Sequence, residues 1–360
     1  MSVPIESARK MNLIDVLMEE HPDIPEPPEE AAFKWSEERI IRYFDRGGVL
    51  EADASFDNVL ELQTNAIPWE PLDRYDKFIQ MMSERLPALA SYPSVKLAKV
   101  ELSGAGPAGC MKMRVYTPEH EPRASFPAIL YLMGGGYATC NLEERDFFLS
   151  NLARAGFTVL SVEYQTAGTG AVYPAANEDA MAALCWIASG NHGDELYFQS
   201  SRVVVMGDSA GGHLASVLPL MLLQRGGEAP QIKAHVLLCP GIDYGNASPD
   251  LFPYFKGVDH SKDQLANPLV ADDSPLSQLP PVFVATAHDD EYEQIMRLNS
   301  SACTYASRLR DLGVTVSLRE YYGKPRRSHV FMVQRGPWAL DATVDIVEWL
   351  HQIVYDKDDV

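Results

Sequence analysis

The pattern of hydrophobic and polar positions changes near residue 95 of this 360-residue chain. Beyond that point, short apolar runs rich in Val, Ile, Leu and Ala alternate with longer segments whose apolar residues recur every three or four positions. Short continuous apolar runs are typical of strands buried on both faces, and the longer period is typical of amphipathic helices. We therefore expect strands of a buried sheet to alternate with covering helices.

The expected elements can be placed by residue range. The expected strands are Val95–Leu102, Lys112–Tyr116, Ala128–Met133, Thr158–Val162, Val203–Met206, Ala234–Leu238, Val282–Ala287 and Thr315–Glu320. The expected helices are Arg145–Ala155, Ala175–Ala188, Ala210–Gln224, Leu298–Leu312 and about Trp338–Ile353. The first two strands read as an antiparallel pair. Because the later strands alternate with long helices, we predict an α/β fold with a mostly parallel sheet covered on both faces.

Residues 1–90 differ in composition from the rest of the chain. This segment is rich in proline and glutamate and contains helical patches at Asn12–Glu20, Trp35–Phe44 and Asp73–Arg85. We expect it to form a helical N-terminal extension, followed by a single α/β domain over residues 91–360.

Composition narrows the classes of partner. The net charge of −20 disfavours nucleic acids and anionic membranes, which attract basic surfaces. No apolar stretch reaches 18 residues, and the N-terminus lacks a basic region followed by an apolar one, so neither a membrane anchor nor a secretory signal is expected. Five scattered cysteines form no C-x-x-C pair, which argues against zinc and disulfides. These features favour the cytoplasm.

A glycine-flanked serine is the first candidate for chemistry. Gly207-Asp208-Ser209-Ala210-Gly211-Gly212 follows an expected strand and opens an expected helix. Strand, G-x-S-x-G and helix is the context in which a serine nucleophile sits on a sharp turn at the edge of a sheet. The alternative is a glycine-rich turn with a capping serine.

Later loops carry the partners that a serine nucleophile needs, in the order Ser, Asp, His. The strand ending at Ala287 is followed by His288, Asp289 and Asp290, and the next strand is followed by a loop with His329. Spacing leaves both Asp289 and Asp290 open as the acid. His288 competes with His329 as the base, but it lies beside the acids, whereas the fold requires the base on the later loop.

A glycine run supplies candidate donors for an oxyanion. Gly134-Gly135-Gly136 directly follows the expected strand Ala128–Met133. Its main-chain N–H groups are unobstructed by side chains, and the N–H of Ala210, after the candidate nucleophile, is the second expected source.

These motifs together resemble the hormone-sensitive-lipase family of α/β-hydrolases, over about residues 95–355. The resemblance rests on the glycine run, the two late loops and the stretches Tyr173–Ala180, Gly207–Gly212, Asn267–Leu269 and Leu279–Val282. It implies an α/β-hydrolase fold with a helical lid, built from residues 1–90 and an insertion at about 241–266. The family pattern T-A-x-x-D implies Asp290 as the acid, with Asp289 as the fallback. The family also implies Gly135 and Gly136 as oxyanion donors, joined by Ala210.

The chain departs from the family pattern in four places. Met133 stands where the family's oxyanion loop begins with histidine, and the D-P-L-R-D run is degraded to Asp290-Glu291-Tyr292-Glu293-Gln294. The Y-R-x-A-P-E stretch is replaced by Tyr164–Thr169, and the lid regions differ in length. We expect these changes to alter substrate preference.

The resemblance implies a serine carboxylesterase that hydrolyses a small or medium apolar ester or lactone through an acyl-enzyme. One alternative is a tailoring enzyme of secondary metabolism (lyase, dehydratase, cyclase or acyl transferase) on the same fold. Another is a ligand-binding module without catalysis. A complete Ser209, Asp290 and His329 set favours an enzyme.

Several hydrophobic residues are candidates to line the substrate pocket, although each is equally well explained as a core residue. They are Met133, Tyr137, Tyr244, Phe252 and Phe331. No clustered His, Cys or Asp spacing indicates a metal or an organic cofactor. The resemblance also allows a homodimer.

Overall fold

The computed structural model describes residues 95–119, 125–190, 196, 198–226, 230–245, 252–323, 327–334 and 337–355. The predicted helical extension over residues 1–90 lies outside the described residues, as does part of the predicted insertion at 241–266. Both therefore stay predictions.

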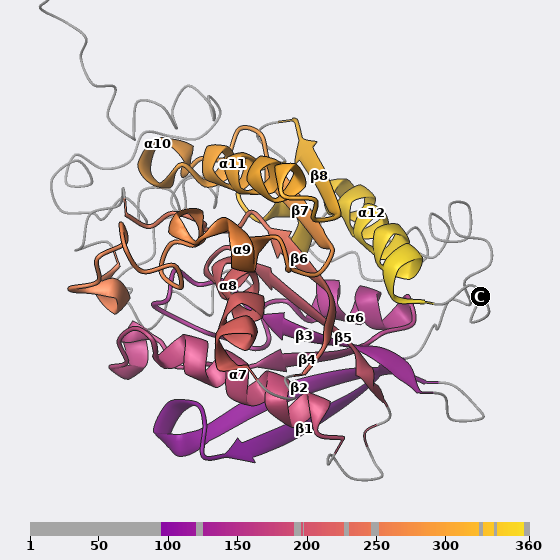
Figure 1. Ribbon diagram of the computed structural model, residues 1–360. Coiled ribbons are helices and arrows are strands. Elements are labelled where there is room, and N and C mark those ends of the chain that lie inside the picture. Colours follow the sequence, from indigo (N-terminus) through magenta and orange to yellow (C-terminus); the bar gives the residue numbers. More distant parts are fainter. Residues whose placement is uncertain are drawn as a thin grey trace, which may run out of the picture. The chain divides into compact units, whose positions relative to one another are not determined.

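The described residues form an eight-stranded sheet (Figure 1). Its strands are β1 (Val95–Ser103), β2 (Cys110–Pro118), β3 (Phe126–Leu132), β4 (Thr158–Val162), β5 (Phe198–Asp208), β6 (Ile232–Leu238), β7 (Val282–Ala287) and β8 (Val316–Tyr321). Their order across the sheet is β1-β2-β4-β3-β5-β6-β7-β8. β2 is antiparallel to both neighbours, and all other pairs are parallel. The predicted mostly parallel α/β sheet is confirmed.

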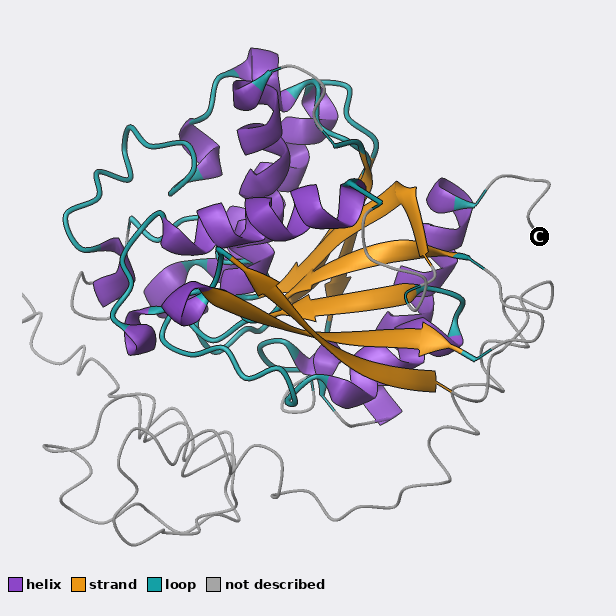
Figure 2. Ribbon diagram, turned by 90° about the horizontal axis from the view of Figure 1, so that it is seen from below, coloured by secondary structure: helices purple, strands orange, loops and turns teal. Residues whose placement is uncertain are grey.

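Helices cover both faces of this sheet (Figure 2). The α-helices are α6 (Asp146–Arg154), α7 (Ala175–Ala188), α8 (Ala210–Arg225), α9 (Asp273–Leu276), α10 (Glu293–Met296), α11 (Leu298–Asp311) and α12 (Pro337–Val354). Short 3-10 helices include η4 (Pro253–Phe255) and η6 (Phe331–Val333). None of the helices in these ranges is both long and apolar enough to cross a bilayer.

Alternate residues of each central strand enter two separate cores. On β3, Leu130 and Leu132 belong to the core shared with α7, α8 and α11, whereas Ile129 and Tyr131 belong to the core shared with α6 and α12. All four side chains are fully buried. Burial on both faces explains why the central strands read as continuous apolar runs rather than as an alternating pattern.

Strand β5 begins earlier than predicted. We expected Val203–Met206, but pairing with β3 starts at Phe198, opposite Phe126, and continues through a register shift between Pro127 and Ala128. The added segment includes Gln199–Arg202. These four residues are polar and at least partly exposed, so the sequence shows no apolar run there. Backbone pairing at the rim of the sheet needs no apolar side chains, which explains the difference.

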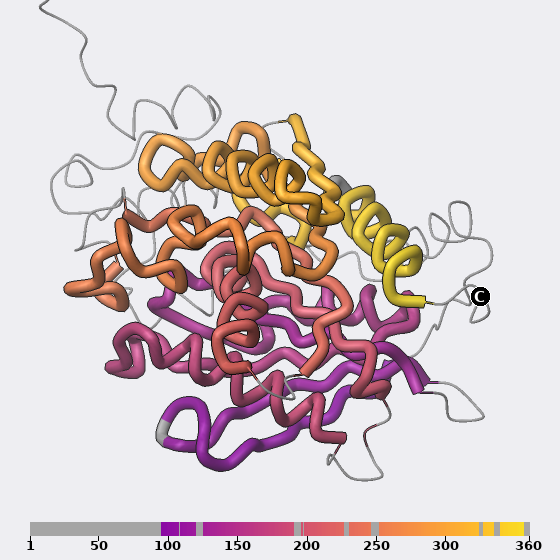
Figure 3. The backbone as a smooth tube through the Cα atoms, in the orientation of Figure 1, coloured from indigo at the N-terminus to yellow at the C-terminus, as the bar shows by residue number. Residues whose placement is uncertain are grey.

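Parallel strands bring distant loops to one end of the sheet. The tube in Figure 3 runs from the indigo strand β1 at one edge of the sheet to β8 at the other. The loops after β3, β5, β7 and β8 all leave the sheet at the carboxyl ends of parallel strands, where ligands bind in α/β sheets.

Candidate active site

Ser209 occupies a sharp turn between β5 and α8. Its backbone has φ 53° and ψ −117°, a conformation that residues other than glycine rarely adopt. The flanking glycines permit the turn: a Cβ on Gly211 would lie 1.9 Å from the carbonyl oxygen of Leu132, and one on Gly207 would lie 2.2 Å from the carbonyl oxygen of Gly211. Strain of this kind concentrates at functional sites.

Three of the predicted residues form a hydrogen-bonded chain. His329 Nε2 lies 2.9 Å from Ser209 Oγ, and His329 Nδ1 lies 2.7 Å from Asp290 Oδ2. Since an ionised carboxylate can only accept, Nδ1 donates to Asp290 and Nε2 is left to accept the serine proton. The arrangement can activate a hydroxyl as a nucleophile.

The environment of His329 favours its charged form. Burial lowers the pKa of the imidazole, but the charge of Asp290 and the hydrogen bond to it outweigh burial and hold that pKa well above its usual range. A raised pKa means that the imidazolium, which forms when the histidine takes a proton, is stabilised in place.

The structure distinguishes between the two candidate acids and the two candidate bases. Asp290 is 4 % exposed and contacts His329, whereas no such contact joins Asp289 to His329 among the interactions of the described residues. His288 is exposed; it lies 3.4 Å from Glu320 and stacks on Tyr322. The geometry thus agrees with the Asp290 and His329 assignments.

The glycine run after β3 lies beside Ser209, since a Cβ on Gly134 would meet the Ser209 side chain at 2.9 Å. Its main-chain N–H groups are candidate hydrogen-bond donors. Gly135 has φ 152° and Gly136 has φ 59°, and the Gly135 carbonyl accepts from the N–H groups of Ala138 and Thr139. Within the described part of the chain, no protein acceptor is found for the N–H groups of Gly135 and Gly136, or for Ala210 N–H at the start of α8. Their role as donors to a ligand oxygen stays a prediction.

A buried ionic network supports the loop where the family has histidine. Asp208 Oδ1 accepts from Gly134 N–H at 3.0 Å and from the Tyr131 hydroxyl at 2.5 Å, and Asp208 Oδ2 lies 3.1 Å from Arg145. The Met133 side chain is buried in the core on the α6 and α12 face. Sequence reasoning did not single out Tyr131 or Arg145, because neither stands in a motif.

A cluster of rings packs against the other side of the loop. Tyr137 stacks on Tyr254 with ring centroids 4.5 Å apart, and its hydroxyl lies 2.5 Å from Nδ1 of His213. His213 Nε2 lies 3.2 Å from the carbonyl of Ala266, so Nε2 donates and Nδ1 accepts. Burial lowers the pKa of His213 to about 3, which keeps the ring neutral. Tyr244 also packs edge-on against Tyr137.

The five predicted pocket residues are all buried, between 0 and 8 % exposed. Phe252 lies beside the glycine run, since a Cβ on Gly136 would meet its ring at 3.6 Å, and Tyr244 packs on Phe252. Met133 and Phe331 instead belong to the core of α6 and α12, where Phe331 packs edge-on against Tyr321. Contact with a substrate stays a prediction for all five.

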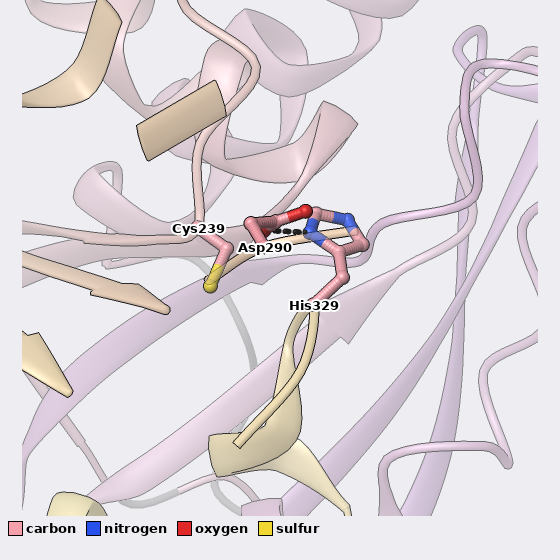
Figure 4. A group of neighbouring side chains, drawn as sticks. All are labelled: Cys239, Asp290 and His329. Carbon is pink, nitrogen blue, oxygen red and sulfur yellow. Dashed lines mark hydrogen bonds and ion pairs between the residues drawn. The ribbon is translucent and has the colours of Figure 1, made fainter. Parts of the chain in front are cut away.

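One group of side chains has ligand types that a metal could use. Sγ of Cys239 and the facing atoms of Asp290 and His329 lie within 4.8 Å of one another (Figure 4). Burial raises the pKa of the Cys239 thiol, which disfavours the thiolate that binds metals. The dashed contact in Figure 4 joins Asp290 to His329, so a metal would have to displace this hydrogen bond. The Asp290–His329 hydrogen bond accounts for two of the three residues, and Cys239 Sγ also lies 3.9 Å from Met332 Sδ.

Comparisons with known proteins agree with the fold and the site. The family model described as "alpha/beta hydrolase fold" matches residues 129–333, more than half of the chain. Esterase LipI of Mycobacterium tuberculosis is 34% identical over 200 residues, covering 55% of this chain and 60% of LipI. Carboxylesterase NlhH of the same species is 31% identical over 224 residues, covering 57% of this chain and 67% of NlhH.

A solved structure extends the likeness over more of the chain. The hyperthermophilic esterase of Pyrobaculum calidifontis superposes with a TM-score of 0.62 at 27% identity, covering 81% of this chain and 100% of that esterase. Residues 129–333, which the family model matches, contain the serine turn, the glycine run and the loops after β7 and β8. The chain therefore belongs to the α/β-hydrolase family, in the hormone-sensitive-lipase-like group of esterases and carboxylesterases.

Proposed function

We propose that this protein is a serine carboxylesterase that hydrolyses small or medium acyl esters or lactones. The proposal depends on the hydrogen bonds that link Ser209 to His329 and His329 to Asp290, because such an arrangement activates a weakly nucleophilic hydroxyl group.

The proposed mechanism begins with attack on the ester carbonyl. His329 Nε2 takes the proton of Ser209 Oγ as this oxygen bonds to the carbonyl carbon, and Asp290 stabilises the imidazolium. The N–H groups of Gly135, Gly136 and Ala210 donate to the oxygen that becomes negative.

Collapse of this intermediate completes the first half-reaction. His329 gives its proton to the departing alkoxide oxygen, the alcohol leaves, and the acyl group stays on Ser209. Water then attacks the acyl carbon while His329 takes a water proton and returns it to Oγ, releasing the carboxylic acid.

The similar proteins support hydrolysis over the tailoring alternative. The three similar proteins described above carry the names esterase or carboxylesterase. The alignments leave about 40% of LipI and a third of NlhH outside the match, so their substrates cannot be carried over whole. The cytoplasmic location, the homodimer and the exclusion of nucleic-acid partners stay predictions.

The test is hydrolysis of p-nitrophenyl esters from acetate to palmitate, with an aromatic lactone as a separate arm. We expect turnover on the shorter acyl chains and a loss of about 10⁶ in kcat for Ser209→Ala. Wild-type protein that hydrolyses none of these and does not react with a serine-directed phosphonate would contradict the proposal. Retained turnover in Ser209→Ala would contradict the acyl-enzyme mechanism.

A further inference from the structure

Glu291 occupies an unexpected place beside His329. It follows Asp290 in the run where the family pattern D-P-L-R-D has proline. Its Oε2 accepts a hydrogen bond from the main-chain N–H of His329 at 2.8 Å. The contact links the loop after β7 to the loop after β8 across 38 residues of sequence. Proline could not make it, because its side chain has no acceptor.

Neighbouring residues of the same loop hold His329 from two further directions. Asp290 Oδ2 contacts the ring at Nδ1, and Asp290 Oδ1 accepts from Tyr292 N–H at 2.9 Å. The Tyr292 ring packs edge-on against the imidazole, with centroids 5.0 Å apart. Residues 290–292 therefore contact His329 at its ring nitrogen, its ring face and its main chain.

The main-chain contact matters because, among the described residues, it is one of two hydrogen bonds made by the backbone of His329 itself, within a turn that Phe331 N–H and the Ser328 carbonyl close at 3.1 Å. Val330 follows with φ 49°, a left-handed conformation that β-branched residues seldom adopt. On the other side of the residue, Gln334 Nε2 lies 3.4 Å from the His329 carbonyl, at the long limit of a hydrogen bond. Of these two backbone contacts, the one to Glu291 is the shorter by 0.6 Å.

Placing a carboxyl here is costly. Burial and the adjacent charge of Asp290 raise the pKa of Glu291, which shows that its ionised form is disfavoured at this position. The surroundings of Glu291 disfavour its ionised form, so solubility does not explain a carboxyl group at this position. The hydrogen bond from Glu291 to the main chain of His329 explains it better.

We propose that Glu291 is a positioning residue, which fixes the main chain of His329 and so keeps Nε2 within hydrogen-bonding distance of Ser209. This inference rests on the proposed esterase activity. Displacement of a catalytic group by about 1 Å can cost about 10² in rate, so the expected effect falls on kcat.

The test compares Glu291→Ala with Glu291→Gln, using p-nitrophenyl acetate and counting active sites by reaction with a serine-directed phosphonate. We expect Glu291→Ala to lower kcat per titrated site by about 10–100-fold, with KM changed less than about threefold. Glu291→Gln keeps an oxygen acceptor and should recover most of kcat. Melting temperatures identify any variant that fails to fold, and the two variants are compared only per titrated site.

Glu293→Ala provides the matched control. Glu293 is on the same segment, but its Oε2 accepts from the N–H groups of Asn299 and Ser300 at the start of α11. We expect lower stability with unchanged kcat per titrated site. Unchanged kcat in Glu291→Ala, or equal damage in Glu291→Gln, would overturn the positioning role while leaving the esterase intact. A wild type without esterase activity would overturn both proposals.

Discussion

The candidate site has two sides, and they differ in which groups contact the functional residues directly. On the base side, His329 is held by the carboxyl groups of Asp290 and Glu291. On the proposed oxyanion side, the glycine run is backed by packed rings around Tyr137, and the buried Asp208–Arg145 pair holds Gly134 from beneath. A base must change its charge in every turnover, so charged partners suit it. Oxyanion donors have to stay fixed, and dense aromatic packing provides that rigidity.

Two histidines show the difference most clearly: His213 is fully buried, and the side chain of His329 is 12% exposed. The pKa of His329 is raised because Asp290 outweighs burial, whereas burial lowers the pKa of His213 to about 3, since its hydrogen-bond partners, Tyr137 and Ala266, carry no charge to oppose it. Burial lowers the pKa of both rings. The partner decides whether a buried histidine can carry a proton or stays neutral.

Removing the charge on the base side is expected to have the largest effect in this comparison. Asp290→Asn should lower kcat by about 10⁴, since the amide no longer stabilises the imidazolium or fixes the reactive tautomer. It should also move the acid limb of the kcat/KM–pH profile to lower pH. Activity requires neutral His329 and is lost as pH falls through its raised pKa, which Asp290 no longer raises in the variant.

Asp289→Asn is the control for that prediction, with kcat expected within about twofold of wild type because surface changes away from the site have small effects. Steady-state kinetics from pH 5 to 9 measure both variants. Equal losses in the two variants would show that Asp290 is not the acid.

The second-largest effect is expected from breaking the Arg145–Asp208 ion pair, which lies beneath the proposed oxyanion loop. Arg145→Met leaves the fully buried Asp208 carboxylate without its cation, and breaking a buried pair typically costs about 3–5 kcal/mol. Lys112→Met is the control, because the Lys112–Glu163 pair is partly exposed, with its charged atoms 3.8 Å apart, and should be worth less than about 1 kcal/mol. Urea unfolding measures both free energies. Similar losses in the two variants would rule out a special role for the Asp208 pair.

The smallest effect is expected from replacing His213, and it falls on the pH dependence of the free energy of unfolding. Folded His213 has a pKa of about 3, while the unfolded residue titrates near 6.5, so below pH 6.5 the unfolded state binds the extra proton. Stability attributable to His213 is present above pH 6.5 and falls toward pH 3, by up to about 1.4 kcal/mol per pH unit.

His213→Asn should therefore lessen the decline in unfolding free energy between pH 6 and pH 4, as measured by urea unfolding at each pH. Exposed His288→Asn serves as the comparison and is expected to keep the wild-type slope. An unchanged slope in His213→Asn would mean that the ring takes up a proton in the folded protein.

The sequence predicted the sheet and the central chemistry because these depend on local patterns. Apolar runs marked the strands, and motifs before and after them marked Ser209, Asp290 and His329, which the structure brings together. Arg145, His213 and Glu291 could not be predicted in this way. Their partners are 63, 76 and 38 residues away in sequence, and a charged or polar residue in such a position looks like a surface residue until the fold is known.

The order of the strands also bears on when this chain acquires reactivity during synthesis. Ser209 lies 120 residues before His329, and His329 follows β8, which pairs with β7 at the edge of the sheet. A ribosome-bound chain that ends before residue 329 has the serine but no base to deprotonate it. Since chains fold from the N-terminus as they emerge, Ser209 has no base until residue 329 has been synthesised and has left the ribosome. Labelling of nascent chains by a serine-directed phosphonate would thus report completion of the sheet.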